Sequence, residues 1–208
     1  MKIALSRRLV LAATLALGLA APAFAEPQLG QPAPAFRAMD ENGREHALSD
    51  FAGKTVVLEW TNSGCPYVGK HYSSGTMQAL QKKATGDGVA WLTVSSSAPD
   101  TQGYFTAATA RLWRAKVHSA ATAILLDSAG KIGREYAAKN TPHMFVIDKA
   151  GKVAYMGGID DRPYADPASL KGAKPYVALA LADLKAGRPV ATPVSQPYGC
   201  SVKYNSAD

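Results

Sequence analysis

The chain has 208 residues, of which 47% are hydrophobic and 19% are charged, a composition typical of a globular protein with its own core. Its formal net charge is +7, but the basic residues are spread along the chain rather than gathered in one block, so we expect no nucleic-acid partner. Its two cysteines, Cys65 and Cys200, are too few for a disulfide-rich scaffold, and chemical reactivity is the leading explanation for them.

Residues 1–25 have the three-part pattern of a secretory signal peptide. Three basic residues and no acid precede an apolar run over residues 9–20, and Ala23 and Ala25 flank Phe24 at a cleavage site. An uncleaved anchor helix is the alternative, but the run is shorter than the roughly 20 residues of a membrane span. We therefore expect a periplasmic or secreted mature chain of 183 residues (208 − 25), without a membrane span and with a net charge of +4 (+7 − 3).

The mature chain is predicted to begin with a hairpin, in which residues 36–39 and 45–48 flank an Asn42-Gly43 turn. Residues 55–60 are mostly apolar, as in a central strand buried on both faces, and a helix is predicted over residues 68–83. Further strands are predicted over residues 89–94, 122–127, 144–148 and 153–158, and further helices over residues 102–116, 131–138 and 176–185.

Strands alternate with helices along this order, and the chain then closes with a hairpin and a helix. The pattern predicts a single α/β domain over residues 26–190, with a mixed central sheet flanked by helices. Residues 191–208 form a tail without clear periodicity, and this tail carries Cys200.

Cys65 lies between elements rather than inside one. The turn-forming residues Asn62, Ser63 and Gly64 precede it, and Pro66 suits the first turn of a helix. Unpaired backbone amides and the helix dipole at such a position favour a thiolate over a thiol. The alternative is a small buried hydrophobic residue, the usual environment of a free cysteine. The flanking residues favour a reactive Cys65.

This order of features resembles the thioredoxin-like superfamily, and within it the exported redoxin and peroxiredoxin-like group of the AhpC/TSA type. The resemblance covers roughly residues 30–190 and depends on the N-terminal hairpin, residues 48–54, the strand that ends in Glu59-Trp60, Cys65-Pro66-Tyr67, Thr141-Pro142 and the closing hairpin. It implies a thioredoxin-like fold and an exported thiol oxidoreductase with antioxidant activity. Its partners would be a thiol/disulfide protein or a peroxide, together with an external thiol reductant.

Three positions depart from the patterns of the superfamily. The second cysteine of the thioredoxin C-x-x-C motif maps to Val68, so Cys65 is the single cysteine of the motif and needs a resolving sulfur from elsewhere. The proline and threonine of the peroxiredoxin P-x-x-x-T-x-x-C motif map to Leu58 and Asn62. Whether the oxidant is a disulfide or a peroxide therefore stays open.

The resemblance implies roles for three other residues. Pro142 maps to the cis-proline loop, whose backbone lies against the reactive sulfur and pairs with an extended substrate segment, and Thr141 would face the sulfur. Glu59 lies six positions before Cys65, where thioredoxins carry a buried carboxylate that is proposed to move protons. The alternative for Glu59 is a solvated or salt-bridged carboxylate.

Cys200 is the remaining candidate for the resolving thiol. It could attack a sulfenate or a mixed disulfide on Cys65, in its own chain or in a dimer partner, and the tail is long enough to reach. The alternatives are a thiol without a role and one bonded to an external thiol. The oligomeric state stays open.

The rival function is a non-catalytic module that binds an extended peptide or a soft metal. Cys65 with His71 or His143 offers ligands for Cu(I), but related copper sites use two cysteines and one of these is missing. We therefore expect neither a cofactor nor a resident metal.

Overall fold

A five-stranded mixed sheet forms the centre of the protein, in a computed structural model that describes residues 26–205. The strands are β3 (Val56–Trp60), β4 (Ala90–Ser95), β5 (Ala123–Leu126), β7 (His143–Ile147) and β8 (Val153–Gly157), in the spatial order β5-β4-β3-β7-β8. Strands β3, β4 and β5 are parallel, whereas β7 runs antiparallel to both β3 and β8. The predicted mixed sheet is confirmed.

Strand β3 is central because both of its faces carry side chains that are buried. All five of its residues are buried. Successive side chains of a strand point to opposite faces, so Leu58 and Trp60 belong to one hydrophobic core and Val57 to the other. The apolar run therefore places the end of β3, and the turn after it, at the middle of the fold.

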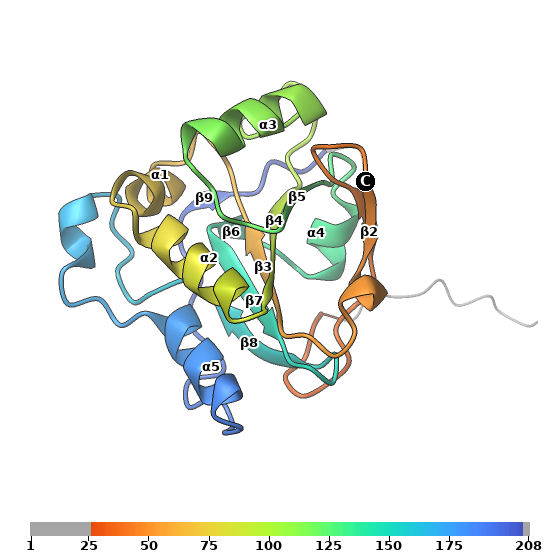
Figure 1. The fold of residues 1–208 in the computed structure, drawn as a ribbon. Helices are drawn as coiled ribbons and strands as arrows, with labels where there is room; N and C mark the ends of the chain where they lie inside the picture. Colours follow the sequence, from red (N-terminus) through yellow and green to blue (C-terminus); the bar gives the residue numbers. More distant parts are fainter. Residues whose placement is uncertain (1–25, 206–208) are drawn as a thin grey trace, which may run out of the picture.

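One face of the sheet is covered by α1 (Pro66–Ser73), α2 (Thr76–Gly86) and α5 (Tyr176–Lys185) (Figure 1). These helices contribute the fully or almost fully buried side chains of Val68, Met77 and Val177 to a common core. The amphipathic pattern of α5 predicted its bounds correctly.

The single helix predicted over residues 68–83 is wrong, because Ser74 and Gly75 separate α1 from α2. The Ser73 and Ser74 hydroxyls donate to carbonyl oxygens of the preceding turn, and Gly75 has a left-handed backbone with φ +77°. Serine hydroxyls compete for helical carbonyls and glycine adopts positive φ without strain, so the hydrophobic periodicity alone missed this break.

The N-terminal hairpin, β1 (Arg37–Met39) and β2 (Glu45–Ala47), and α4 (Lys131–Glu135) belong to the other side of the sheet, where Trp60 is buried. The helix α3 (Ala107–Lys116) packs Ala110 against the β5 edge. It begins later than predicted because Thr106 caps it. Two short 3-10 helices, η1 (Leu48–Phe51) and η2 (Pro167–Leu170), complete the connections.

The tail packs along the domain rather than extending away from it. Strand β9 (Cys200–Ser201) pairs antiparallel with β6 (Asn140–Thr141) in a separate two-stranded sheet, visible beside α1 in Figure 1. Further back along the chain, Met156 and the tail backbone exchange hydrogen bonds near Ser195. Within residues 26–205 no helix is long and apolar enough to cross a membrane, and the predicted signal peptide lies outside these residues.

Candidate active site

Cys65 occupies the N-cap of α1, at the start of a helix that follows the carboxyl end of β3. The Asn62 side chain builds the turn between them, since its Oδ1 accepts a hydrogen bond from the Gly64 amide at 2.8 Å. The Cys65 amide donates to the Asn62 carbonyl oxygen, and Pro66 occupies the first helical turn. The predicted layout of strand, turn, cysteine and helix is confirmed.

The Cys65 sulfur lies against the loop that precedes β7. Its side chain is only 2% exposed, and its thiol donates to the Thr141 carbonyl oxygen at 3.1 Å. The Thr141–Pro142 peptide bond is cis, as the resemblance implies. The structure thus brings Thr141 and Pro142 to Cys65, although Cys65 and Thr141 are 76 positions apart in the sequence.

Cys200 lies at the same place. Thr141 and Cys200 are directly paired residues of β6 and β9, and the Thr141 hydroxyl donates to the Cys200 carbonyl oxygen at 3.3 Å. Both cysteines are free thiols, and Cys200 packs against the core cluster that contains Cys65, close enough for each thiol to shift the pKa of the other. The two cysteines of the chain therefore meet within one subunit.

The two thiols differ in pKa because their surroundings differ. Burial raises the pKa of Cys65, but the neighbouring Cys200 thiol, the Thr141 side chain and the Val68 amide favour the thiolate, outweigh burial and bring the pKa below its ordinary value. Burial and, to a smaller extent, the neighbouring Cys65 raise the pKa of Cys200 to about 11. Near neutral pH, Cys65 is thus the better candidate for the thiolate, and Cys200 keeps its proton.

Glu59 is completely buried, which excludes the alternative of a solvated carboxylate. Its oxygens accept hydrogen bonds from four neutral side chains on three elements: Trp91 at 2.7 Å, Tyr72 at 2.9 Å, Gln81 at 3.0 Å and Thr93 at 3.3 Å. Burial raises the pKa of Glu59 to about 7, against the opposing effect of these donors. The group can therefore gain or lose a proton near neutral pH.

The two histidines considered as metal ligands are bonded elsewhere. The His71 ring contacts the Tyr198 and Thr76 hydroxyls, and His143 Nδ1 accepts from the Lys139 amide at 3.3 Å. Across residues 26–205, no three or more His, Cys, Asp or Glu side chains gather in a way that could hold a metal ion.

Sequence reasoning missed a buried polar cluster beside this site, formed by Lys70, His71, Asp160 and Tyr198. Tyr198 lies two positions before Cys200, and Lys70 and His71 belong to the helix that begins at Cys65. No local pattern links these residues, because Asp160 reaches α1 only through the fold of the domain and Tyr198 joins them only through docking of the tail.

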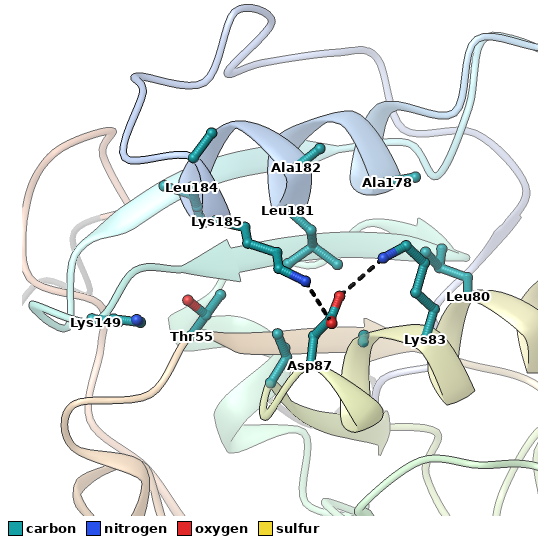
Figure 2. Close-up of a pocket in the computed structure, with 13 residues that line it drawn as sticks. Thr55, Leu80, Lys83, Asp87, Lys149, Ala178, Leu181, Ala182, Leu184 and Lys185 are labelled. Atoms are coloured by element: carbon teal, nitrogen blue, oxygen red, sulfur yellow. Dashed lines mark hydrogen bonds and ion pairs between the residues drawn. The ribbon is translucent and has the colours of Figure 1, made fainter.

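Two of the pockets in the described part of the chain bear on the location of the site, and neither is lined by Cys65 or Cys200. A pocket of about 360 Å³ between α2 and α5 has Asp87 bonded to Lys83 and Lys185 at its wall and contains none of the expected site residues (Figure 2). A wider pocket of about 690 Å³ between α1 and α3 includes Ser63 and Val68, which flank Cys65 in the sequence. No tail residue lines that second pocket.

The mixed sheet, the cysteine at the start of α1 and the cis-proline loop beside it define a thioredoxin-fold protein. The AhpC/TSA family model matches residues 29–156, and the chain belongs to this family. Membership indicates a thiol–disulfide oxidoreductase or a thiol peroxidase. No curated protein sequence matches the chain.

Solved structures agree with this fold. An uncharacterized conserved protein from Geobacillus kaustophilus is similar with a TM-score of 0.74 and 22% identity, over 87% of this chain and 94% of that chain. A proposed thiol:disulfide interchange protein DsbE from Chlorobium tepidum is similar with a TM-score of 0.51 and 27% identity, over 63% of this chain and 85% of that chain. The peroxidoxin BcpB from Mycobacterium tuberculosis is similar with a TM-score of 0.55 and 18% identity, over 78% of this chain and 99% of that chain.

Proposed function

We propose that this protein is an exported thiol oxidoreductase with antioxidant activity, in which Cys65 is the attacking thiolate and Cys200 of the same chain is the resolving thiol. The observation that carries the proposal is the meeting of two free thiols at one loop, since Cys65 contacts the Thr141 carbonyl oxygen and Cys200 is paired with Thr141 across β6 and β9. In addition, the pKa is lowered at Cys65 and raised at Cys200. Val68 removes the usual local resolving cysteine, and Cys200 supplies a sulfur at the same site.

The cycle balances with either class of oxidant. With a peroxide, the Cys65 thiolate takes one oxygen to become a sulfenic acid and an alcohol or water leaves. With a disulfide, Cys65 forms a mixed disulfide and releases one thiolate. The Cys200 sulfur then attacks Cys65, an S–S bond forms, and water or the second thiol leaves. An external dithiol reduces this bond and becomes a disulfide itself.

The docked tail favours a small oxidant. Strand β9 pairs with the backbone edge at Thr141, the edge where the resemblance places an extended protein substrate. A protein disulfide would have to displace the tail, whereas a peroxide or a small disulfide needs no such displacement. The pocket beside Ser63 and Val68 supports an approach from the side of α3, since the tail does not line it.

Glu59 is proposed as the proton carrier for this cycle. Its pKa of about 7 suits proton transfer near neutral pH, and Tyr72 connects it to the helix that begins at Cys65. Thr141 and Pro142 act as positioning residues, because their loop holds both the Cys65 thiol and strand β9.

The rival function, a non-catalytic module for an extended peptide or a soft metal, has less support. The chain's own tail fills the edge that a peptide would use, and both candidate histidines are bonded to other groups.

Turnover assays test the proposal. The protein is supplied with hydrogen peroxide or glutathione disulfide and with a thioredoxin system as reductant, and consumption of each oxidant is followed. We expect Cys65→Ser to abolish consumption and Cys200→Ser to stop after one equivalent, with a sulfenic acid or a mixed disulfide on Cys65 by mass spectrometry. Ser201→Ala, a neighbouring tail change, should leave turnover unchanged. The proposal fails if the protein consumes neither oxidant, or if Cys200→Ser turns over as fast as the unchanged protein.

A further inference from the structure

Tyr198 fastens the tail two residues before Cys200. Its hydroxyl donates to Asp160 Oδ1 at 2.5 Å, and the Tyr198 and Asp160 residues are only 9% and 4% exposed. A hydrogen bond to a buried carboxylate is one of the stronger kinds in proteins, because the acceptor is charged. The contact therefore fixes the tail at a defined point close to its cysteine.

The other groups around this hydroxyl come from α1. His71 Nε2 lies 3.2 Å from the Tyr198 hydroxyl, and burial lowers the pKa of His71 to about 4, so the ring is neutral. Because the hydroxyl donates its proton to Asp160, the neutral ring is assigned as the donor to the hydroxyl oxygen. Lys70 Nζ lies 4.8 Å from the centre of the Tyr198 ring and 4.0 Å from Asp160 Oδ1.

Helix α1 and the tail are thus joined at two points. At the start of the helix, Cys65 contacts Cys200, and one to two turns later Lys70 and His71 contact Tyr198. Between the two tail residues lies Gly199, with φ +119°. A fixed tyrosine on one side of this glycine restricts where the cysteine sulfur can move, and restriction of two reacting groups raises their effective concentration.

We propose that Tyr198 is a positioning residue, docked in the buried cluster of Lys70, His71 and Asp160, and that this docking holds Cys200 against Cys65 for disulfide formation. This inference rests on the proposed resolving role of Cys200. It assigns a positioning role in disulfide formation to the buried cluster of Lys70, His71, Asp160 and Tyr198.

A glutathione equilibrium tests this inference without requiring turnover. Glutathione disulfide oxidises the cysteine pair, so that one Cys65–Cys200 bond forms and two molecules of reduced glutathione are released. The ratio of oxidised to reduced protein, at known glutathione concentrations, gives the effective concentration of the pair. In Tyr198→Phe, which removes only the hydroxyl, we expect this value to fall at least about ten-fold, the size expected for loss of a hydrogen bond to a charged group.

Controls separate positioning from a general loss of structure. Tyr164→Phe makes the same change at a residue that is 62% exposed and should keep the effective concentration of the unchanged protein. In a Cys200→Ser background, Tyr198→Phe should leave the alkylation rate of Cys65 within about two-fold. Asp160→Asn should also lower the effective concentration, and its effect should not add fully to that of Tyr198→Phe, because the two groups act through one bond.

The inference is overturned if Tyr198→Phe retains the effective concentration of the unchanged protein, or if the unchanged protein forms no Cys65–Cys200 bond at all. It is also overturned if, in the Cys200→Ser background, Tyr198→Phe changes the alkylation rate of Cys65 by as large a factor as it changes the effective concentration. Failure of the proposed function has a different signature. In that case the glutathione equilibrium shows the expected loss in Tyr198→Phe, while the turnover assays show no consumption of peroxide or disulfide.

Discussion

Burial opposes the ionised form of Cys65, Cys200 and Glu59 alike, yet the three groups have different acidities. The groups around the Cys65 sulfur outweigh its burial, whereas Cys200 lies next to the group that ionises first and has its pKa raised to about 11. Glu59 has four neutral donors and a pKa of about 7, because its burial is complete. At the scale of single residues, partners decide which group carries the charge.

Glu59→Gln should raise the free energy of unfolding above pH 7 and change this free energy little near pH 4. Burial raises the pKa of Glu59 from an ordinary value of 4.5 to about 7, so the folded state binds more protons than the unfolded chain between these values. Stability is therefore lost as the pH rises through this range, by on the order of 3 kcal/mol. A neutral glutamine avoids this loss, since its amide oxygen accepts from Trp91 and its nitrogen donates to Tyr72.

Urea unfolding at pH 4.5, 6 and 8 measures this effect. Glu45→Gln, the same substitution at an exposed carboxylate, serves as the matched control. A stability difference between Glu59→Gln and the unchanged protein that stays constant over this pH range would contradict the raised pKa.

Short elements, rather than long ones, hold the site together. The two-residue strands β6 and β9 place Cys200 opposite Thr141, and Gly199 allows β9 to approach this closely. A Cβ atom on Gly199 would lie 2.0 Å from the Thr141 carbonyl oxygen, and the φ of +119° is one that other residues rarely adopt. The pairing of β6 with β9 therefore depends on the absence of one side chain.

Gly199→Ala is expected to detach β9 and release Cys200. Alkylation of Cys200 should become about ten-fold faster or more, given the strain of a clashing residue with positive φ. The pKa of Cys65 should rise at the same time, because the neighbouring Cys200 thiol is one of the groups that lower it. Alkylation as a function of pH, with peptide mass spectrometry to separate the two cysteines, measures both effects.

Gly187→Ala provides the matched control for this change. Gly187 also has a positive φ, of +69°, but a Cβ atom there has no neighbour within 4 Å. Its substitution should leave both alkylation rates unchanged. Equal effects of the two substitutions would show that the close approach at Thr141 does not position the tail.

At the scale of the whole molecule, a buried sheet with a core on each face supports one site where distant segments meet. The core beside α1 includes Cys65 itself, together with Val57, Val68 and Tyr198. The tail thus contributes to the packing that surrounds Cys65, and the domain and its tail share one core.

Removal of residues 1–25 is the prediction at this scale. Expressed in a Gram-negative host, the protein should be recovered from the periplasm with Glu26 as its first residue, because Ala23 and Ala25 form a small-residue cleavage site. Intact-mass measurement of the periplasmic and cytoplasmic fractions checks this, and Ala25→Leu should leave the segment uncleaved. Recovery of a chain that begins at Met1 only in the cytoplasm would contradict it.

The local features of this protein could be predicted from its amino-acid sequence. The apolar run of β3, the turn before Cys65, Pro66 after it and the missing cysteine at Val68 are all properties of neighbouring residues, so they could be predicted. The break between α1 and α2 was missed because the Ser74-Gly75 signal is weaker than the hydrophobic periodicity around it.

The residues that complete the site became evident only from the three-dimensional structure. The sequence offered Cys200 as one resolving thiol among alternatives, and the pairing of β6 with β9 brought it to Cys65. The same holds for the four donors around Glu59 and for the docking of Tyr198 on Asp160. These contacts depend on packing between segments far apart in the chain, and such packing leaves no pattern in the residues next to each partner.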